Sequence, residues 1–321
     1  MKGLERLGVI LKLSRKHAKW EHKDLFRLLH QEDIWIAAYE NIKGNREALT
    51  QGISKETLDG LGLTRLHNIQ KEVLEERYRF KPVKLTWIPK PNGTMRPLGV
   101  PTASDKLVQE VIRMILVAIY EPNFDERSFG FRSGLGVHDA LSYVENEFRW
   151  VDWVIKGDIK AAYPTTTIEH KKLCEILSQR IKDGRFMNLI HKSLKCGVFD
   201  NLNTLDSKLG VPQGSIGSIV SPILANIYFN ELDEWISSKA KEVYVEKSTK
   251  RNPEYKRIQY QIQKLNKLVD QSDRNSKERE RLSQDIKGLI QKRNKTRSLL
   301  NQGLEIRYAR YADDWIIGIK G

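Results

Sequence analysis

Two short apolar runs near the C-terminal end of the chain, Leu304–Tyr308 and Trp315–Ile319, predict a pair of β-strands. Between them stands Tyr311-Ala312-Asp313-Asp314, so the turn would carry two adjacent carboxylates. Neighbouring carboxylates repel each other unless a cation neutralises them. Oxygen ligands suit Mg²⁺, which is usually held by one or two carboxylates together with waters and substrate phosphates. An acidic turn alone is more often a solvated loop, so a metal site needs partners elsewhere in the chain.

The composition predicts a globular protein with a polyanionic partner. The 321 residues are 40% hydrophobic and 30% charged, with a formal net charge of +14. This charge favours nucleic acid over an anionic membrane surface, because the sequence has no apolar run of about 18 residues and no signal peptide. Two separated cysteines, Cys174 and Cys196, favour neither a disulfide framework nor a zinc site, so we expect a reducing, intracellular setting.

Helical and strand-like patterns together predict an α+β fold. The helical patterns cover much of the first 80 residues, apart from a loop-like stretch at Asn41–Gly62, and then Ser104–Ile119, Ile168–Ile181, Arg185–Lys195 and Ser218–Ser237. The strand-like runs are Lys84–Lys90, Thr94–Val100 and Val151–Lys156. Because Pro91-Asn92-Gly93 joins the first two runs, they are expected to form a β-hairpin.

The segment Lys239–Leu300 differs from the rest in charge. It holds 18 Lys and Arg against 8 Asp and Glu, a net +10. Apolar residues recur at helical spacing on both sides of the polar stretch Asp270–Glu280, which predicts an inserted basic helical hairpin. Contact with RNA or DNA and a role as a solvated spacer are equally supported.

Asp158, which follows the strand-like run Val151–Lys156, is the expected partner of the acidic turn. Side chains alternate along strands, so Asp313 and Asp314 should point to different faces. We therefore expect Asp158 and Asp313 as main metal ligands and Asp314 as a secondary one. Two Mg²⁺ ions about 3.5–4 Å apart would activate a 3′-hydroxyl and stabilise a leaving pyrophosphate.

Two other motifs carry weaker signals. Gln213 and Gly214 lie in Gly210–Ser215, where the backbone can approach a nucleotide, although such a motif in isolation is more often a plain turn before a helix. Lys90 and Arg96 flank the Asn-Gly turn, where two cations suit a triphosphate.

The wording of these motifs resembles one protein family. The segments that carry the resemblance are Ile88-Pro89-Lys90, Arg96–Pro101, Ser128–Arg132, Ser221–Tyr228 and Tyr311–Asp314. In this order they resemble the group II intron-encoded reverse transcriptases, or maturases. The resemblance runs from about residue 35 to the C-terminus, and the basic insertion is similar to that of the mitochondrial-like branch.

The resemblance implies a right-hand polymerase with an antiparallel palm sheet packed on helices. The expected segments are an N-terminal extension with helical fingers at 1–80, fingers with the β-hairpin at 81–150, palm at 151–237, basic helical insertion at 238–303 and the catalytic palm hairpin at 304–321. The family continues into a thumb and later domains, so the chain is expected to be a fingers-palm fragment with weak or no processive synthesis.

Residue roles follow from the same resemblance. Asp158, Asp313 and Asp314 match the catalytic carboxylates, and Ile159 matches a residue that offers its carbonyl to the metal. Tyr163 matches the aromatic side chain that excludes a ribose 2′-hydroxyl, Lys90 and Arg96 match triphosphate ligands, and Gln213 and Gly214 match the loop beside the nucleotide. Lys12, Arg15, Lys16 and Lys19 are candidate RNA contacts, for which a solvated helix face is equally supported.

The sequence also departs from the family pattern. Pro164 follows Tyr163 where the family has Asp, and Gln213-Gly214 is separated from Ser221-Pro222 by a few more residues than is usual. The longer spacing weakens the assignment of Gln213. None of the departures removes a carboxylate.

The expected function is RNA-directed DNA synthesis with two Mg²⁺ ions, or Mn²⁺ as a substitute, on deoxynucleotides, an RNA template and a DNA primer. The same protein would bind group II intron RNA to assist splicing and retrohoming. A non-catalytic RNA-binding splicing factor on a polymerase scaffold and a retron- or defence-type reverse transcriptase remain alternatives. A homodimer is a further hypothesis. The expected location is a bacterial-type cytoplasm, with an organelle as the alternative and no membrane partner.

Overall fold

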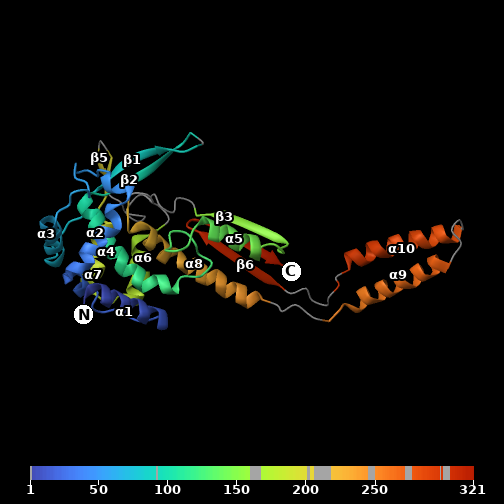
Figure 1. The fold of residues 1–321 in the computed structure, drawn as a ribbon. Coiled ribbons are helices and arrows are strands. Elements are labelled where there is room, and N and C mark those ends of the chain that lie inside the picture. The colour runs from blue at the N-terminus through green and yellow to red at the C-terminus, as the bar shows by residue number, and fades with distance from the viewer. Residues whose placement is uncertain are drawn as a thin grey trace. The chain divides into compact units, whose positions relative to one another are not determined.

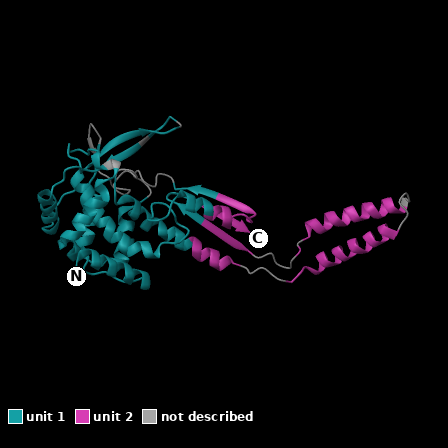
Figure 2. Ribbon diagram, viewed as in Figure 1, with its two compact units in different colours: residues 1–142, 156–235, 309–315 teal, residues 143–155, 236–308, 316–321 magenta. Residues whose placement is uncertain are grey.

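The computed structural model describes two compact units, which Figure 2 colours separately. The described residues are 2–91, 93–159, 168–200, 203–205, 218–244, 250–271, 277–296, 298 and 304–321. Unit 1 comprises residues 1–142, 156–235 and 309–315, and unit 2 comprises 143–155, 236–308 and 316–321. The fold mixes helices and small sheets, which confirms the α+β class (Figure 1). The division into five functional segments stays a prediction.

Helix α4, Ala103–Tyr120, is the centre of the helical core of unit 1. Its N-terminus is capped by Thr102, whose Oγ1 accepts a hydrogen bond from the Asp105 amide at 3.3 Å. Because apolar residues surround α4 on most sides, it is buried along nearly its whole length. The other helices of the unit are α1 (Gly3–Lys16), α2 (Glu32–Lys43), α3 (Leu63–Leu74), α6 (His170–Arg180), α7 (Gly184–Leu194), three 3₁₀ segments (Phe26–His30, Arg46–Leu49 and Glu121–Asn123) and most of α8 (Ser221–Val243).

A four-stranded sheet in unit 1 has the order β2-β1-β4-β5. Strands β1 (Val83–Pro89) and β2 (Met95–Val100) pair antiparallel, which confirms the Asn-Gly hairpin. At its end the Lys90 amide donates to the Thr94 carbonyl at 2.7 Å. Strands β4 (Val198–Asp200) and β5 (Asn203–Leu205) were not predicted, because three residues are too few to show a period of two.

A three-stranded sheet has the order β3-β7-β6 and consists of Trp153–Asp158, Asp314–Lys320 and Glu305–Tyr311. Strands β6 and β7 form the hairpin expected around the acidic turn. Strand β3 was predicted two residues too early, and its last residue is Asp158 itself. The reason is Gly157, where a Cβ would overlap the Trp315 ring. Glycine lets the strand continue beneath the indole.

Unit 2 contains the expected basic helical hairpin, formed by α9 (Pro253–Gln271) and α10 (Lys277–Lys295). Figure 1 shows the two helices side by side, and Arg293 Nη1 donates to Gln259 Oε1 across them at 3.1 Å. Ile258 and Ile262 are the buried residues of α9, which agrees with the predicted apolar spacing.

Helix α5, Val137–Glu147, was not predicted. Within the described part of the chain, no helix combines the length and apolar character needed to cross a membrane.

Candidate active site

The acidic turn joins strands β6 and β7. Ala312 is buried and has a φ of 56°, a left-handed conformation that is uncommon for a residue with a Cβ. Asp313 is half-buried, whereas Asp314, the first residue of β7, is exposed. Backbone strain of this kind persists only where surrounding contacts hold it, and it is frequent at functional sites. Contacts with the rest of the fold therefore hold the turn in this conformation, unlike a simple solvated loop.

The end of strand β3 lies directly against this turn. The Ile159 amide donates a hydrogen bond to the Asp313 carbonyl oxygen at 3.0 Å. This bond places Asp158, whose side chain is exposed, beside the turn that carries Asp313 and Asp314. The structure thus brings together two segments that are more than 150 residues apart in the sequence.

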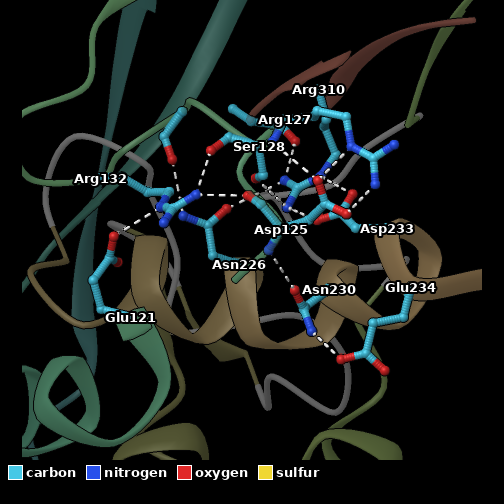
Figure 3. A network of polar contacts seen from close by, with 12 residues as sticks. Glu121, Asp125, Arg127, Ser128, Arg132, Asn226, Asn230, Asp233, Glu234 and Arg310 are labelled. Carbon is cyan, nitrogen blue, oxygen red and sulfur yellow. Dashed lines mark hydrogen bonds and ion pairs between the residues drawn. The ribbon is translucent and has the colours of Figure 1, made fainter. Parts of the chain in front are cut away.

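Arg310, near the end of β6, is buried, with 1% of the residue exposed. Figure 3 shows it in a network with Asp233, Asn226 and Ser128. Its Nε and Nη2 donate to the two carboxylate oxygens of Asp233 on α8, at 2.8 and 2.7 Å. Nη1 donates to the Ala312 carbonyl at 2.7 Å and to Asn226 Oδ1 at 3.2 Å, while Nη2 also reaches Ser128 Oγ at 2.7 Å. Bidentate charge-assisted hydrogen bonds are strong and directional. They tie the strained turn to helix α8.

A loop around Gly130 supports the turn from another side. A Cβ on Gly130 would overlap the backbone nitrogen of Ala312, so only glycine permits this approach. Asn226 Nδ2 donates to the Gly130 carbonyl at 2.8 Å, and Arg132 Nη1 donates to the Ser128 carbonyl at 2.7 Å. These contacts give the predicted motif Ser128–Arg132 a structural role.

The donor chemistry of the site fits a hard divalent cation. The predicted ligands, which are three carboxylates and the Ile159 carbonyl, offer only oxygen atoms, the donors that Mg²⁺ and Mn²⁺ prefer. Within the described residues, however, no three His, Cys, Asp or Glu side chains converge closely enough to form a metal site by themselves. An ion held here would need further oxygens from substrate phosphates and water, which is the usual arrangement for Mg²⁺.

Comparison with known families shows which family the chain belongs to. A family model described as "Reverse transcriptase (RNA-dependent DNA polymerase)" matches residues 88–321. This segment includes the acidic turn, the end of β3 and the supporting loop. The chain belongs to the reverse transcriptase family.

Curated relatives of this chain confirm the resemblance to group II intron-encoded proteins. The group II intron-encoded protein LtrA of Lactococcus lactis is 36% identical over 92% of this chain and 49% of its own length. An uncharacterized 91 kDa protein in the cob intron of Schizosaccharomyces pombe is 35% identical over 96% of this chain and 37% of its own. A putative COX1/OXI3 intron 1 protein of Saccharomyces cerevisiae is 34% identical over 94% of this chain and 34% of its own length. The chain spans about half or less of the length of these relatives.

The expected nucleotide contacts of this chain lie in several segments. Lys90 is exposed at the end of the β1–β2 hairpin, and Arg96 pairs with Ile88 in that hairpin through its backbone. Tyr163, Gln213 and Gly214 lie outside the described residues. Their roles remain predictions.

The four candidate RNA contacts are all exposed, but they do not share one helix. Lys12, Arg15 and Lys16 lie on α1, which ends at Lys16. Lys19 comes after the end of the helix, because His17 adopts an extended backbone. The expected common helix face is therefore limited to the first three residues.

Sequence reasoning missed Arg310 and Asp233. The available signal was the pair of arginines, Arg307 and Arg310, in the strand Glu305–Tyr311, since an arginine that is buried in a strand requires a partner. That partner lies 77 residues away, and neither periodicity nor motif spacing identifies it.

Proposed function

We propose that this chain is the polymerase domain of a group II intron-encoded protein and synthesises DNA on an RNA template. The observation that carries the proposal is the hydrogen bond from Ile159 to Asp313, because it joins the end of β3 to the acidic turn. Carboxylates from these two segments would face one reaction site. Nucleotide transfer needs little covalent chemistry from the protein, which mainly places its reactants and stabilises charge.

The residues of the turn and of β3 would hold the metal. Asp158 and Asp313 are proposed as the main ligands, with Asp314 and the Ile159 carbonyl as additional ones. A divalent ion bound there would favour ionisation of the primer hydroxyl and neutralise charge on the leaving group. Arg310 keeps the turn in place through the Ala312 carbonyl.

Other residues would bind the incoming nucleotide. Lys90 and Arg96 would take the triphosphate, Tyr163 would exclude a ribose 2′-hydroxyl, and Gln213 with Gly214 would lie beside the base. We propose that unit 1 corresponds to fingers and palm in the right-hand description of polymerases. The binding of group II intron RNA is proposed from the relatives' names and from the net charge of +14.

A second candidate is a non-catalytic RNA-binding factor on the same scaffold. The basic segment Lys239–Leu300, with its net charge of +10, favours RNA binding that needs no active carboxylates. The two candidates differ in what a single change at the turn should do. Asp313→Asn should abolish DNA synthesis and leave RNA affinity unchanged if the chain is a polymerase.

Primer extension tests the proposal. The 321-residue chain and a longer form of the protein would be supplied with an RNA template, a DNA primer and deoxynucleotides, with and without Mg²⁺. Mg²⁺-dependent extension that Asp313→Asn removes from both forms would support the polymerase. RNA binding without extension in either form would favour the splicing factor, and a comparable rate in the Asp313→Asn variant would contradict the metal assignment.

A further inference from the structure

A pocket of about 550 Å³ opens among four segments of unit 1, namely the residues after α1, the end of α4 with the 3₁₀ segment that follows it, α6 and α8. The carboxylates of the acidic turn and of β3 do not line it. Tyr120, Ile176, Ile227 and Arg180 are its buried residues. A partly apolar, partly polar pocket of this size is typical of small-molecule sites.

Arg180, the last residue of α6, places a cation among these buried residues. Only 9% of the residue is exposed. Nη1 donates to Asn123 Oδ1 at 2.9 Å, and the guanidinium carbon lies 5.1 Å from the centroid of the Tyr120 ring. Nε and Nη2 are also buried, and within the described residues neither has a hydrogen-bond partner. Burial lowers the pKa of Arg180, which reflects the unfavourable free energy of this charge.

Arg310 in the same unit shows how a buried guanidinium is normally satisfied. It donates to both oxygens of Asp233 and to three further acceptors. Among the ion pairs of the described chain, none involves Arg180. A buried donor without an acceptor is unfavourable, and more so when it is charged. Arg180 therefore has unused capacity for an oxyanion.

We propose that this pocket binds a small molecule through a single carboxylate, which accepts hydrogen bonds from the Arg180 guanidinium. Because Nε and Nη2 are buried, binding would include a rotation of the side chain that exposes them to the ligand, and such rotamer changes are common at binding sites. A flat apolar group attached to the carboxylate would pack on Tyr120 and Phe124, which also line the pocket. This inference does not depend on the polymerase assignment.

The charges of the exposed rim disfavour multiply charged anions. The exposed charged side chains that line the pocket around its buried residues are three carboxylates, Glu21, Glu231 and Glu234, and one ammonium, Lys19. The rim is therefore net negative, so it repels polyphosphates and the backbone of nucleic acids more strongly than a singly charged ligand. Donor groups on the ligand would meet the glutamates.

Fluorine NMR of para-fluorobenzoate with the 321-residue chain tests the proposal. We expect the probe resonance to broaden, and unlabelled benzoate to reverse the broadening. Arg180→Lys keeps the charge but removes the planar fork, so affinity should fall about tenfold to a hundredfold. Arg79→Lys, at an exposed arginine outside the pocket, should leave affinity unchanged.

A second variant keeps the test decisive if Arg180→Lys does not fold. Glu231→Gln removes an exposed rim charge, so the affinity for para-fluorobenzoate should rise about twofold to fivefold. The absence of probe broadening, an equal affinity in folded Arg180→Lys, or a Glu231→Gln affinity that does not rise would each overturn the proposal. Displacement by inorganic phosphate as effective as that by benzoate would overturn the preference for a monoanionic carboxylate.

Discussion

Replacing Arg310 by methionine should destabilise unit 1 and reduce DNA synthesis. The substitution leaves the Asp233 carboxylate buried, at 0% exposure, without its bidentate partner. Breaking a buried ion pair from one side costs about 3–5 kcal/mol, because the remaining carboxylate loses two charge-assisted hydrogen bonds in a buried setting. The Ala312 carbonyl also loses its donor, so the strained turn is released. Denaturant unfolding followed by tryptophan fluorescence would give the change in free energy of unfolding.

The matched control is an exposed arginine with the same kind of partner. Arg77 forms an ion pair with Glu75, and their side chains are 68% and 40% exposed. Arg77→Met should change the free energy of unfolding by less than about 1 kcal/mol, because water and salt screen exposed pairs. Equal effects of Arg77→Met and Arg310→Met would refute the reasoning.

A double variant separates stability from positioning. Arg310→Met combined with Asp233→Leu removes both buried charges and should recover more than half of the lost free energy of unfolding. It does not restore a donor for the Ala312 carbonyl, so primer extension should stay low. Full recovery of extension in the double variant would show that Arg310 acts on stability alone.

Three further predictions concern other parts of the chain. Burial, with a smaller contribution from the charge of Arg180, lowers the pKa of His22 from 6.5 to about 4. As the pH falls from 6.5 to 4, the unfolded state therefore binds the proton before the folded state does. The stability that His22 contributes above pH 6.5 should be lost over this range, with a loss of about 2 kcal/mol in the free energy of unfolding at pH 5. Gly130→Ala should lower the free energy of unfolding by about 1–3 kcal/mol and reduce primer extension, because the added Cβ would push against Ala312. Gly8→Ala, with no atom near its Cβ, should instead stabilise α1 by about 0.5–1 kcal/mol. Tyr163→Val should increase the incorporation of ribonucleotides in a competition assay.

Each of these has a contradicting result. The pH dependence of stability would be measured by urea unfolding of the His22→Gln variant and of the parent chain. The same pH dependence in both would exclude His22 as the titrating group. Equal stability changes for Gly130→Ala and Gly8→Ala would show that the close approach to Ala312 does not matter. Unchanged sugar selectivity in Tyr163→Val would end its assignment as the steric gate.

Local signals in the sequence predicted those elements that depend on neighbouring residues. The Asn-Gly turn gave the β1–β2 hairpin, and apolar spacing gave the paired helices α9 and α10. The acidic turn and its position between two strands were also predictable, because short apolar runs flank it. Motif order then predicted the family.

Features that depend on tertiary contacts were not predictable. The apolar pattern of β3 ends before Gly157, but the strand continues to Asp158 because the Trp315 ring covers the glycine. Arg310 and Asp233 are unremarkable in the sequence until the fold buries both of them. The support of the candidate site was therefore missed, whereas the metal-binding roles of its carboxylates stay predictions.

The central claim is that Asp158 and the acidic turn form one reaction site. Single-nucleotide addition by Asp158→Asn, measured on an RNA template with a DNA primer, tests this claim most directly. The reference is Asp59→Asn, which changes an exposed carboxylate far from Asp158 in the sequence. We predict a loss of about a hundredfold or more for Asp158→Asn, because a charge that stabilises the reaction is removed, and an unchanged rate for Asp59→Asn. Equal rates for the two variants would contradict the claim.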